Sequence, residues 1–252
     1  MDVAPASSVR LSIPAAGFED VVLRKVGLIG GMSWVSTGMY YEWINQGVTK
    51  HCGPMVSAPL LIESLDFAEL YGLTKDDEWD RAAEILVNSA KRLEAAGAEA
   101  LAIAANSMHR LYDQVADAVD VPVLHIADAV GEKMKAAGAV NAALIGTRNV
   151  MTESFYRRKL VSHGIDLLPP DMSNVDRTNE IIYEELMRGK ASRNSERFFR
   201  TMITNLEQAG AKAIVLACTE LDMVIDVDAN VLPIFDSARI HSEAVVDWIL
   251  ER

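Results

Sequence analysis

One cysteine in this chain stands where it could act on a proton. Cys218 comes directly after the apolar run 213–217 and is followed by Thr219 and Glu220. If a helix opens at Thr219, its backbone dipole lowers the pKa of the thiol, and a thiolate is a base or nucleophile near neutral pH. A lone free cysteine is more often a buried structural residue. The polar residues beside Cys218, at the end of an apolar run, favour a functional thiol.

Other polar side chains also stand directly after apolar runs. Asn106 and Ser107 follow one such run, and Thr147 follows another. Together with Thr219 they offer amide, hydroxyl and backbone N–H donors, which suit a carboxylate. Singly, each is at least as well explained as a helix N-cap. Four such groups at equivalent strand ends favour a shared binding role.

Further patterns in the chain give weaker signals. Segment 27–36 is rich in glycine but matches neither G-x-G-x-x-G nor a Walker loop. A strand–helix turn with positive φ is the simpler interpretation, also at Gly27. Cys52 falls in a predicted loop and is given no role. The histidines lack the spacing of a metal site and are more simply core or surface residues; they are His109, His125 and His241.

These candidate residues belong to an alternating pattern of strands and helices. Short apolar runs bounded by glycine or polar residues predict buried strands, and amphipathic periodicity predicts helices between them. Such alternation implies parallel sheets with right-handed crossovers. The predicted strands are 26–31, 58–64, 100–105, 121–126, 142–147 and 213–217, and the predicted helices are 37–50, 80–96 and 197–209.

The pattern occurs twice. Segment 210–221 echoes 97–108, so that Cys218 stands 113 residues after Ala105, and Gly146 stands 116 residues after Gly30. We therefore predict an α/β fold of two pseudo-symmetric lobes, each a parallel sheet flanked by helices. Ligands bind at the carboxyl ends of strands in such sheets, so the active site is expected in the cleft between the lobes. The predicted division is a flexible N-terminal extension at 1–24, a first lobe of 25–120 with 225–252, and a second lobe of 121–224.

Composition narrows the functional classes. The 252 residues include 24 Lys and Arg against 36 Asp and Glu, a formal charge of −12. Such an acidic chain is a poor ligand for nucleic acid or for an anionic membrane surface. Two cysteines are too few for a disulfide-dense secreted scaffold or a cysteine metal cluster, and no apolar run reaches about 18 residues. We expect a cytoplasmic protein that acts on a small molecule.

Several of these segments together resemble one known family. Gly30–Thr37, Asn106–His109 and Ala217–Glu220 are similar to the aspartate/glutamate racemase superfamily, and most of all to its broad-specificity amino-acid racemases, which work without pyridoxal phosphate. The resemblance runs from Val26 to the C-terminus. Further similar stretches are 144–148, 181–186, 232–236 and 240–241.

The resemblance implies a mechanism and a set of site residues. To invert an α-carbon, one group removes the proton and a group on the opposite face returns one. The family uses two thiols for this, one in each lobe, and needs neither a metal nor an organic cofactor. By resemblance, Cys218 is the second-lobe thiol. The carboxylate-binding positions fall on Asn106, Ser107, Thr147 and Thr219, with Met32 and Ser33 near the substrate.

The chain departs from the family at the other thiol. That position falls on Ala105, and a methyl group cannot carry a proton. Three explanations stay open: a natural or engineered weakening of a racemase; replacement by Ser107, His109 or a held water; or chemistry that needs a single acid, as in the superfamily's arylmalonate decarboxylases. A fourth is a catalytically impaired amino-acid-binding homologue.

The leading prediction is a racemase of a small amino acid or related acid, altered at Ala105 and active as a homodimer. The side chain of the substrate is not indicated by the sequence. Arg148 and Arg177 could pair with an acidic substrate, but solvated surface residues are the simpler interpretation for both.

Overall fold

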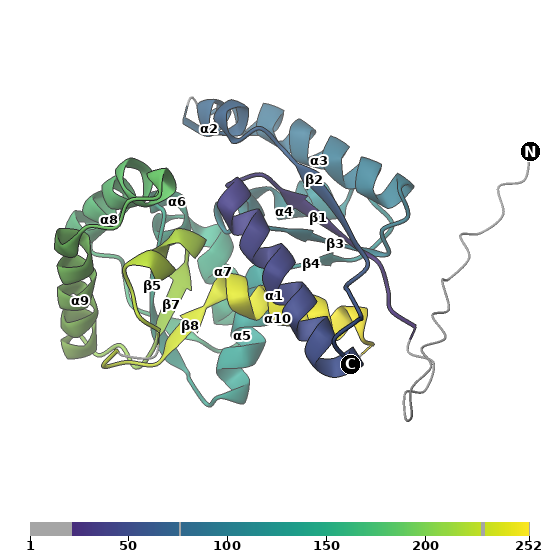
Figure 1. Ribbon diagram of the computed structural model, residues 1–252. Helices are drawn as coiled ribbons and strands as arrows, with labels where there is room; N and C mark the ends of the chain where they lie inside the picture. The colour runs from purple at the N-terminus through teal and green to yellow at the C-terminus, as the bar shows by residue number, and fades with distance from the viewer. Residues whose placement is uncertain (1–21, 76, 228–229, 252) are drawn as a thin grey trace, which may run out of the picture. The chain divides into compact units, whose positions relative to one another are not determined.

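The computed structural model describes residues 22–75, 77–227 and 230–251 (Figure 1). The chain folds into two compact units, each treated by itself below. The first unit holds the chain up to residue 102, segment 113–124 and the segment from 242 onward, and the second holds 103–112 and 125–241. The predicted N-terminal extension, 1–24, lies outside the described residues except for its last three.

The first unit is built on a parallel sheet of four strands in the order β2-β1-β3-β4. β1 and β2 pair in register from Val26 with Leu60 to Gly30 with Ser64. Helical segments join successive strands, as parallel pairing requires. The strands are β1 (Val26–Gly30), β2 (Leu60–Ser64), β3 (Ala100–Ile103) and β4 (Val123–Leu124), and the helices are α1 (Trp34–Cys52), α2 (Phe67–Lys75), α3 (Trp79–Ala95) and α4 (Tyr112–Ala116).

The second unit has a parallel sheet with the equivalent order, β6-β5-β7-β8. Its strands are β5 (Asn141–Gly146), β6 (Asp166–Leu167), β7 (Ile214–Ala217) and β8 (Ile234–Asp236). Its helices are α5 (Ile126–Ala136), α6 (Arg148–Thr152), α7 (Ser154–Ser162), α8 (Met172–Glu184) and α9 (Arg193–Gln208). α10 (Ser237–Ile249) begins in the second unit and ends in the first. The described residues also form the short 3-10 helices η1 (Ser107–Leu111), η2 (Leu186–Arg188) and η3 (Thr219–Met223).

The matching strand orders confirm the two-sheet α/β fold predicted from the repeat. Local detail repeats as well. Helices α3 and α9 are each followed by a glycine with positive φ, 92° at Gly97 and 103° at Gly210. In each copy the alanine after the glycine donates its N–H back to a leucine carbonyl of the helix, Ala98 to Leu93 and Ala211 to Leu206. Only glycine adopts this conformation without strain, which explains its presence at both helix ends.

The structure places the crossing between the units later than the sequence predicts. Residues 225–252 were expected to rejoin the first lobe as a block. β8 instead pairs with β7, from Ile214 with Ile234 to Leu216 with Asp236, so the chain stays in the second unit up to residue 241. Segment 103–112 also belongs to the second unit rather than the first. A strand of three residues gives too weak a periodic signal to be recognised beforehand.

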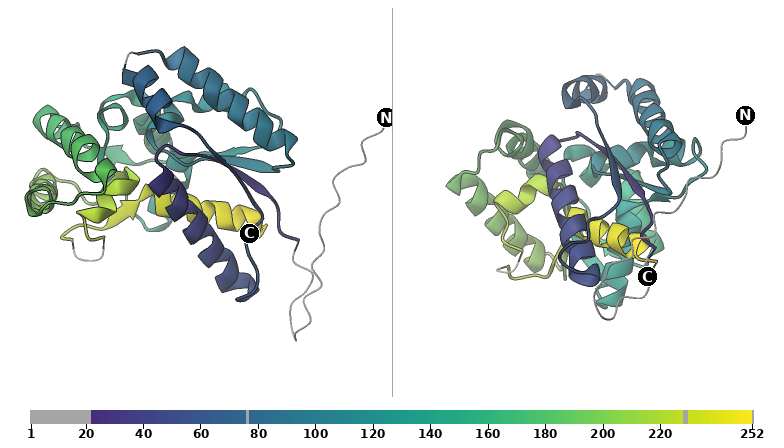
Figure 2. Two further views of the ribbon diagram at one scale, coloured as in Figure 1. Left: turned by 45° about the horizontal axis from the view of Figure 1, so that its top comes forward. Right: turned by 45° about the vertical axis from the view of Figure 1, so that its right-hand side comes forward.

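The second sheet is covered on both faces, and alternate strand residues enter two separate cores. Ala142, Leu144 and Val215 pack with α5 and α7, whereas Ile145, Leu216 and Cys218 pack with α8 and α9. Figures 1 and 2 show these two helix pairs on opposite sides of the sheet. Both cores are almost wholly apolar, so the sheet forms a rigid base for the residues at its carboxyl edge.

In the first unit, glycine is required at two positions for different reasons: backbone conformation at one and close packing at the other. Gly31 has φ 87°, and a Cβ there would lie 2.2 Å from the Leu65 carbonyl oxygen, so the predicted positive-φ turn lies at this residue. Gly27 has no positive φ. Its Cβ would lie 2.7 Å from a methyl group of Leu101 and 3.1 Å from Leu93, so glycine is needed there for close packing of α3 on the sheet.

Cys52 is not in a loop, contrary to the sequence prediction. It is the last residue of α1 and is buried. Burial raises the pKa of its thiol. Both cysteines are unpaired thiols.

Among the described residues, none of the helices combines the length and the apolar character needed to cross a bilayer.

Candidate active site at the carboxyl edge of the second sheet

Three polar residues follow three neighbouring strands of the second sheet. Thr147 comes after β5, Cys218 after β7 and Ser237 after β8. Because Gly146 pairs with Ala217 in register, Thr147 and Cys218 are the next residues along two adjacent strands. The carboxyl edge of this sheet therefore presents a row of hydroxyl and thiol groups.

Cys218 is buried beside a carboxylate. Its thiol donates a hydrogen bond to Oε2 of Glu220 at 3.1 Å, and the two residues are only 8% and 7% exposed. Burial raises the pKa of the Cys218 thiol well above its ordinary value, and the negative charges of Glu220 and Asp222 raise it further. In this state Cys218 is a neutral thiol, and therefore an acid rather than a base.

This finding corrects the expected lowering of the thiol pKa by a helix dipole. A backbone hydrogen bond from Glu220 does act in that direction, but desolvation and the nearby carboxylates outweigh it. The segment after Cys218, η3, is a 3-10 helix of five residues, too short for a strong dipole. The sequence shows Glu220 two residues away but not that its carboxylate turns back onto the sulfur.

The hydroxyl of Thr147 is buried without a hydrogen-bond partner among the described residues. Thr147 occupies the N-cap position of α6, yet its side chain makes no capping bond. The simple N-cap interpretation therefore does not explain this hydroxyl. A buried unsatisfied hydroxyl costs about 1–3 kcal/mol of stability, which marks the position as one that a ligand could satisfy.

Asn106 is held by Ser237 rather than acting as a cap. It occupies the N-cap position of η1 without a side-chain capping bond. The hydroxyl of Ser237 donates to its Oδ1 at 3.0 Å, and both residues are buried. This bond assigns the orientation of the amide, which directs the two N–H donors of Nδ2 away from Ser237. Asn106 is thus prepared to donate to an acceptor such as a carboxylate.

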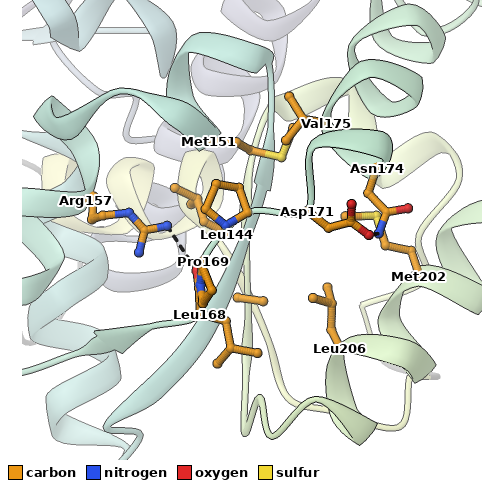
Figure 3. A pocket seen from close by; sticks show the side chains of 12 residues that line it. Leu144, Met151, Arg157, Leu168, Pro169, Asp171, Asn174, Val175, Met202 and Leu206 are labelled. Atoms are coloured by element: carbon orange, nitrogen blue, oxygen red, sulfur yellow. Dashed lines mark hydrogen bonds between the residues drawn. The ribbon is translucent and has the colours of Figure 1, made fainter.

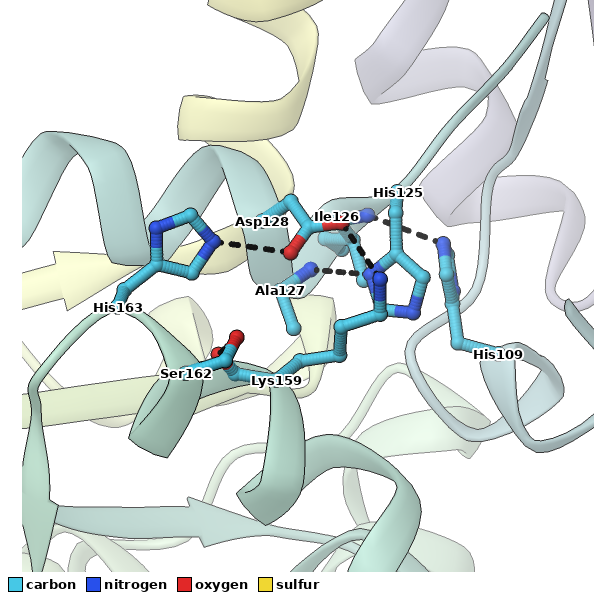
Figure 4. Close-up of polar contacts among 8 residues, drawn as sticks. All are labelled: His109, His125, Ile126, Ala127, Asp128, Lys159, Ser162 and His163. Carbon is cyan, nitrogen blue, oxygen red and sulfur yellow. Dashed lines mark hydrogen bonds and ion pairs between the residues drawn. The ribbon is translucent and has the colours of Figure 1, made fainter.

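Ala105, where the sequence predicts that the family's other thiol is replaced, is held through its backbone. Its carbonyl oxygen accepts a hydrogen bond from Nδ1 of His109 at 2.9 Å, while Nε2 of His109 accepts from the N–H of Ile126 at 3.1 Å. Figure 4 shows His109 meeting Ile126 beside His125. Both ring nitrogens are engaged and the imidazole must be neutral, so His109 cannot exchange a proton without breaking one of these bonds.

The chain is similar to known proteins of one family along most of its length. The model of the Asp/Glu/hydantoin racemase family matches residues 29–245. The chain belongs to this family. The broad specificity amino-acid racemase RacX of Bacillus subtilis is 22% identical over 225 residues, which make up 81% of this chain and 97% of RacX.

Two solved structures support the same membership. A candidate Asp/Glu racemase from Yersinia pestis is 39% identical and has a TM-score of 0.85, covering 90% of this chain and 100% of its own. An aspartate racemase homologue from Pyrococcus horikoshii is 33% identical with a TM-score of 0.77, covering 90% and 99%. The α/β fold predicted from the repeat is thus also that of proteins in this family.

In this racemase-family chain, the remaining predicted site residues fall in both units. Thr219 is buried directly after Cys218, and Ser107 is half-buried at the start of η1. Met32 and Ser33 lie in the first unit, where Met32 is buried. The hydroxyl of Ser33 accepts a hydrogen bond from the backbone of Ser36 and caps α1, so this side chain has a structural role as well.

Sequence reasoning missed two polar residues of this sheet edge, one carboxylate and one hydroxyl. Asp222, in η3, has its pKa raised to about 6 by burial and by the charges of Asp236 and Glu220. Ser237, which orients Asn106, was missed as well. The only signal for these residues was their place after β7 and β8, and β8 itself was not predicted.

A small pocket lies elsewhere in the second unit. Figure 3 shows it between Leu144, Arg157 and Leu206, with Arg157 turned toward the backbone of Leu168. No predicted site residue lines it.

Within the described parts of the chain, no group of three or more His, Cys, Asp or Glu residues is arranged to hold a metal ion.

Proposed function

We propose that this protein is a cofactor-independent amino-acid racemase or close relative that moves the α-proton of a small carboxylic acid at Cys218. One observation carries the proposal: in a chain of the racemase family, a buried thiol stands at the edge of the second sheet, hydrogen-bonded to Glu220, and the unsatisfied hydroxyl of Thr147 follows the adjacent strand. A structural cysteine would need neither neighbour.

The carboxylate of the substrate is assigned to the donors of the same unit. When the α-proton leaves, negative charge develops on the carboxylate oxygens as an enolate forms. A donor already aimed at that charge contributes about 3 kcal/mol to its stabilisation. Asn106 offers Nδ2, and Thr147 offers a hydroxyl that finds no partner among the residues the structure describes. Ser107 and Thr219 complete the proposed set, with Met32 and Ser33 near the substrate.

Ala105 makes the two faces of the substrate unequal. Cys218 can remove and return a proton on one face. On the other face the family's thiol is absent, and His109 is engaged at both nitrogens. Ser107 or a held water remains to deliver a proton there. We therefore propose that inversion is weakened, whereas proton exchange on the face of Cys218 is not.

A second candidate is favoured by the protonation state of the thiol. A neutral thiol can protonate an enediolate left by loss of CO₂, and such a reaction needs only one acid. The raised pKa of Cys218 and the absence of a thiol at Ala105 both suit a single-cysteine decarboxylase or isomerase. Arylmalonates are the substrates that test it. A catalytically impaired amino-acid-binding homologue is the third candidate.

The deciding experiment is α-proton exchange in D₂O. The protein is incubated with a panel of L- and D-amino acids, and α-deuterium content and enantiomer composition are followed together. Exchange that persists with a chelator and a pyridoxal-phosphate scavenger supports the proposal, and loss with either contradicts it. Absence of exchange with every amino acid, together with CO₂ release from an arylmalonate, replaces it by the decarboxylase. Binding of amino acids without either reaction leaves the impaired homologue.

Two further properties are part of the proposal. The two unpaired thiols suit a reducing compartment, so we infer a cytoplasmic protein. We also infer a homodimer, the commonest assembly of soluble enzymes. Light scattering coupled to size-exclusion chromatography checks the second inference, which a monomeric mass would contradict.

A further inference from the structure

The carboxylate of Glu220 is placed to do more than support the fold. It lies within η3 and turns back toward the preceding strand end, where Oε2 accepts the thiol proton of Cys218 at 3.1 Å. Both groups are more than nine-tenths buried. A carboxylate is costly to bury, so its place against the reactive sulfur calls for a reason beyond packing.

Proton abstraction makes a demand that Cys218 alone does not meet. To take a proton from an α-carbon, the sulfur must first lose its own, and its surroundings hold that proton in place. A base must therefore stand within hydrogen-bond reach of the thiol. Thr147 and Thr219 carry hydroxyls, which are not bases at neutral pH. Glu220 is the residue to which the thiol proton already points.

We propose that Glu220 receives the thiol proton of Cys218 when the substrate is bound and returns it at the end of the exchange. This inference rests on the proposed function. The S–H bond breaks and an O–H bond forms on Glu220, leaving a thiolate and a neutral carboxylic acid. The thiolate takes the α-proton, and the C–H electron pair passes into the carboxylate as an enolate. The reverse steps restore every group, and no oxidant or reductant is consumed.

The surroundings are consistent with such a shared proton. A backbone hydrogen bond from Glu220 to the sulfur favours the thiolate once it forms. The charge of Asp222 of η3 also acts on the thiol, and the charge of Asp236 of β8 acts on Asp222. Asp222 acts on the thiol through its charge alone, so it provides a matched control for Glu220.

The test uses the full-length chain with Cys52→Ala, so that Cys218 is the only thiol. Thiolate formation is followed by ultraviolet absorbance across pH, with the Cys52→Ala/Cys218→Ser protein subtracted. Removing the negative charge with Glu220→Gln makes the thiolate easier to form, and we expect its midpoint to fall by about one pH unit or more. The same variant is expected to lose α-proton exchange by about 100-fold, since the thiol proton then has no acceptor.

In Glu220→Gln the thiolate is thus expected to form more easily while α-proton exchange becomes slower. A purely structural role of Glu220 would not produce both effects together. Glu220→Asp, which keeps an acceptor, should restore part of the exchange. Asp222→Asn should lower the midpoint by less than Glu220→Gln and leave exchange within about threefold. Exchange near the wild-type rate in Glu220→Gln overturns the proposal. So does an equal loss of exchange in Glu220→Asp and Glu220→Gln with an unmoved midpoint.

Failure of this inference is distinguishable from failure of the proposed function. If the wild-type protein exchanges no α-proton, the proposed function fails. The thiolate midpoint then still decides whether the pair exists: an unmoved midpoint in Glu220→Gln shows that Glu220 does not hold the thiol proton. A lowered midpoint with substrate exchange intact in that variant shows that the pair exists but is not used.

Discussion

The ends of β3 and β7 are built from one repeated pattern and carry different chemistry. After β7, the thiol of Cys218 donates to a buried carboxylate, and the adjacent strand β5 is followed by the unsatisfied hydroxyl of Thr147. After β3, Ala105 carries only a methyl group, and its carbonyl is bound to an imidazole whose other nitrogen is also engaged. The duplicated framework thus keeps its strand order, whereas one strand end carries a thiol and the other a methyl group. The predictions below break or sharpen this contrast, beginning with the largest expected effect.

Removal of the Cys218 thiol should abolish the chemical difference between the ends of β7 and β3. Cys218→Ser replaces the acid with a hydroxyl that does not ionise in the useful range, so α-proton exchange should fall by about 1000-fold or more. Cys52→Ser is the matched control, since Cys52 lies at the end of α1 in the other unit. Exchange at the wild-type rate in Cys218→Ser would rule out Cys218 as the proton carrier.

Restoration of a thiol after β3 should make the two ends alike. Ala105→Cys supplies a proton carrier at the altered position, and inversion should rise by about 10- to 100-fold relative to exchange. Ala105→Ser adds nearly the same volume without the acidity and serves as the control. An equal response to both variants, measured by chiral chromatography, would show that position 105 does not serve the reaction.

Removal of the unpartnered hydroxyl should separate function from stability. Thr147→Val keeps the shape but eliminates a buried unsatisfied group, so the free energy of unfolding should rise by about 1 kcal/mol. At the same time kcat/KM should fall by about 10- to 100-fold if the hydroxyl binds the substrate. Ser89→Ala removes a comparable unsatisfied hydroxyl from α3 and should change stability alone. Unchanged kcat/KM in Thr147→Val would remove Thr147 from the site.

Loss of the Ser237 hydroxyl should have a smaller effect. Ser237→Ala frees the Asn106 amide to rotate, and a hydrogen bond of about 1 kcal/mol corresponds to roughly a fivefold loss in kcat/KM. The loss should appear mainly in KM if Asn106 binds the ground-state carboxylate. The losses of kcat/KM in Asn106→Ala and Ser237→Ala would add in the double variant only if the two residues acted independently. We expect them not to add.

The smallest expected effect concerns stability, away from both strand ends. Burial raises the pKa of Asp128, but hydrogen bonds from Lys159 and His163, with the charge of His125, bring it below its ordinary value (Figure 4). This stabilisation is present above the unfolded-state pKa of about 3.9 and is lost as pH falls through the folded value. Asp128→Asn should therefore lower stability at neutral pH by no more than about 1 kcal/mol and have no effect in strong acid. Urea titrations at the two pH values measure it.

The sequence was sufficient for the framework and for the identity of most candidate groups. Apolar runs and helical periodicity located β1, α3, β5 and β7 within a few residues, and the repeat implied the equivalent sheets. Prediction from the sequence failed where an element is too short to show a periodic pattern or depends on contacts between distant segments. β8 has three residues, so its pairing with β7 and the boundary at residue 241 were not visible.

The chemical state of Cys218 was harder to predict than its position at the end of a strand. Position on the chain marks Cys218 as a strand-end thiol, but the sign of its pKa shift depends on burial and on where the Glu220 side chain points. Likewise, a threonine at an N-cap position normally caps. Only the structure shows that the Thr147 hydroxyl makes no such bond.

The central claim is that proton chemistry belongs to the Cys218 side and is limited on the other. The most direct measurement is the ratio of α-deuterium incorporation to inversion for each pure enantiomer of a substrate in D₂O. We expect one enantiomer to exchange faster than it inverts, because Cys218 removes and returns the proton on one face. Inversion that keeps pace with exchange from both enantiomers would show that an equally competent group serves the opposite face, and would contradict the account.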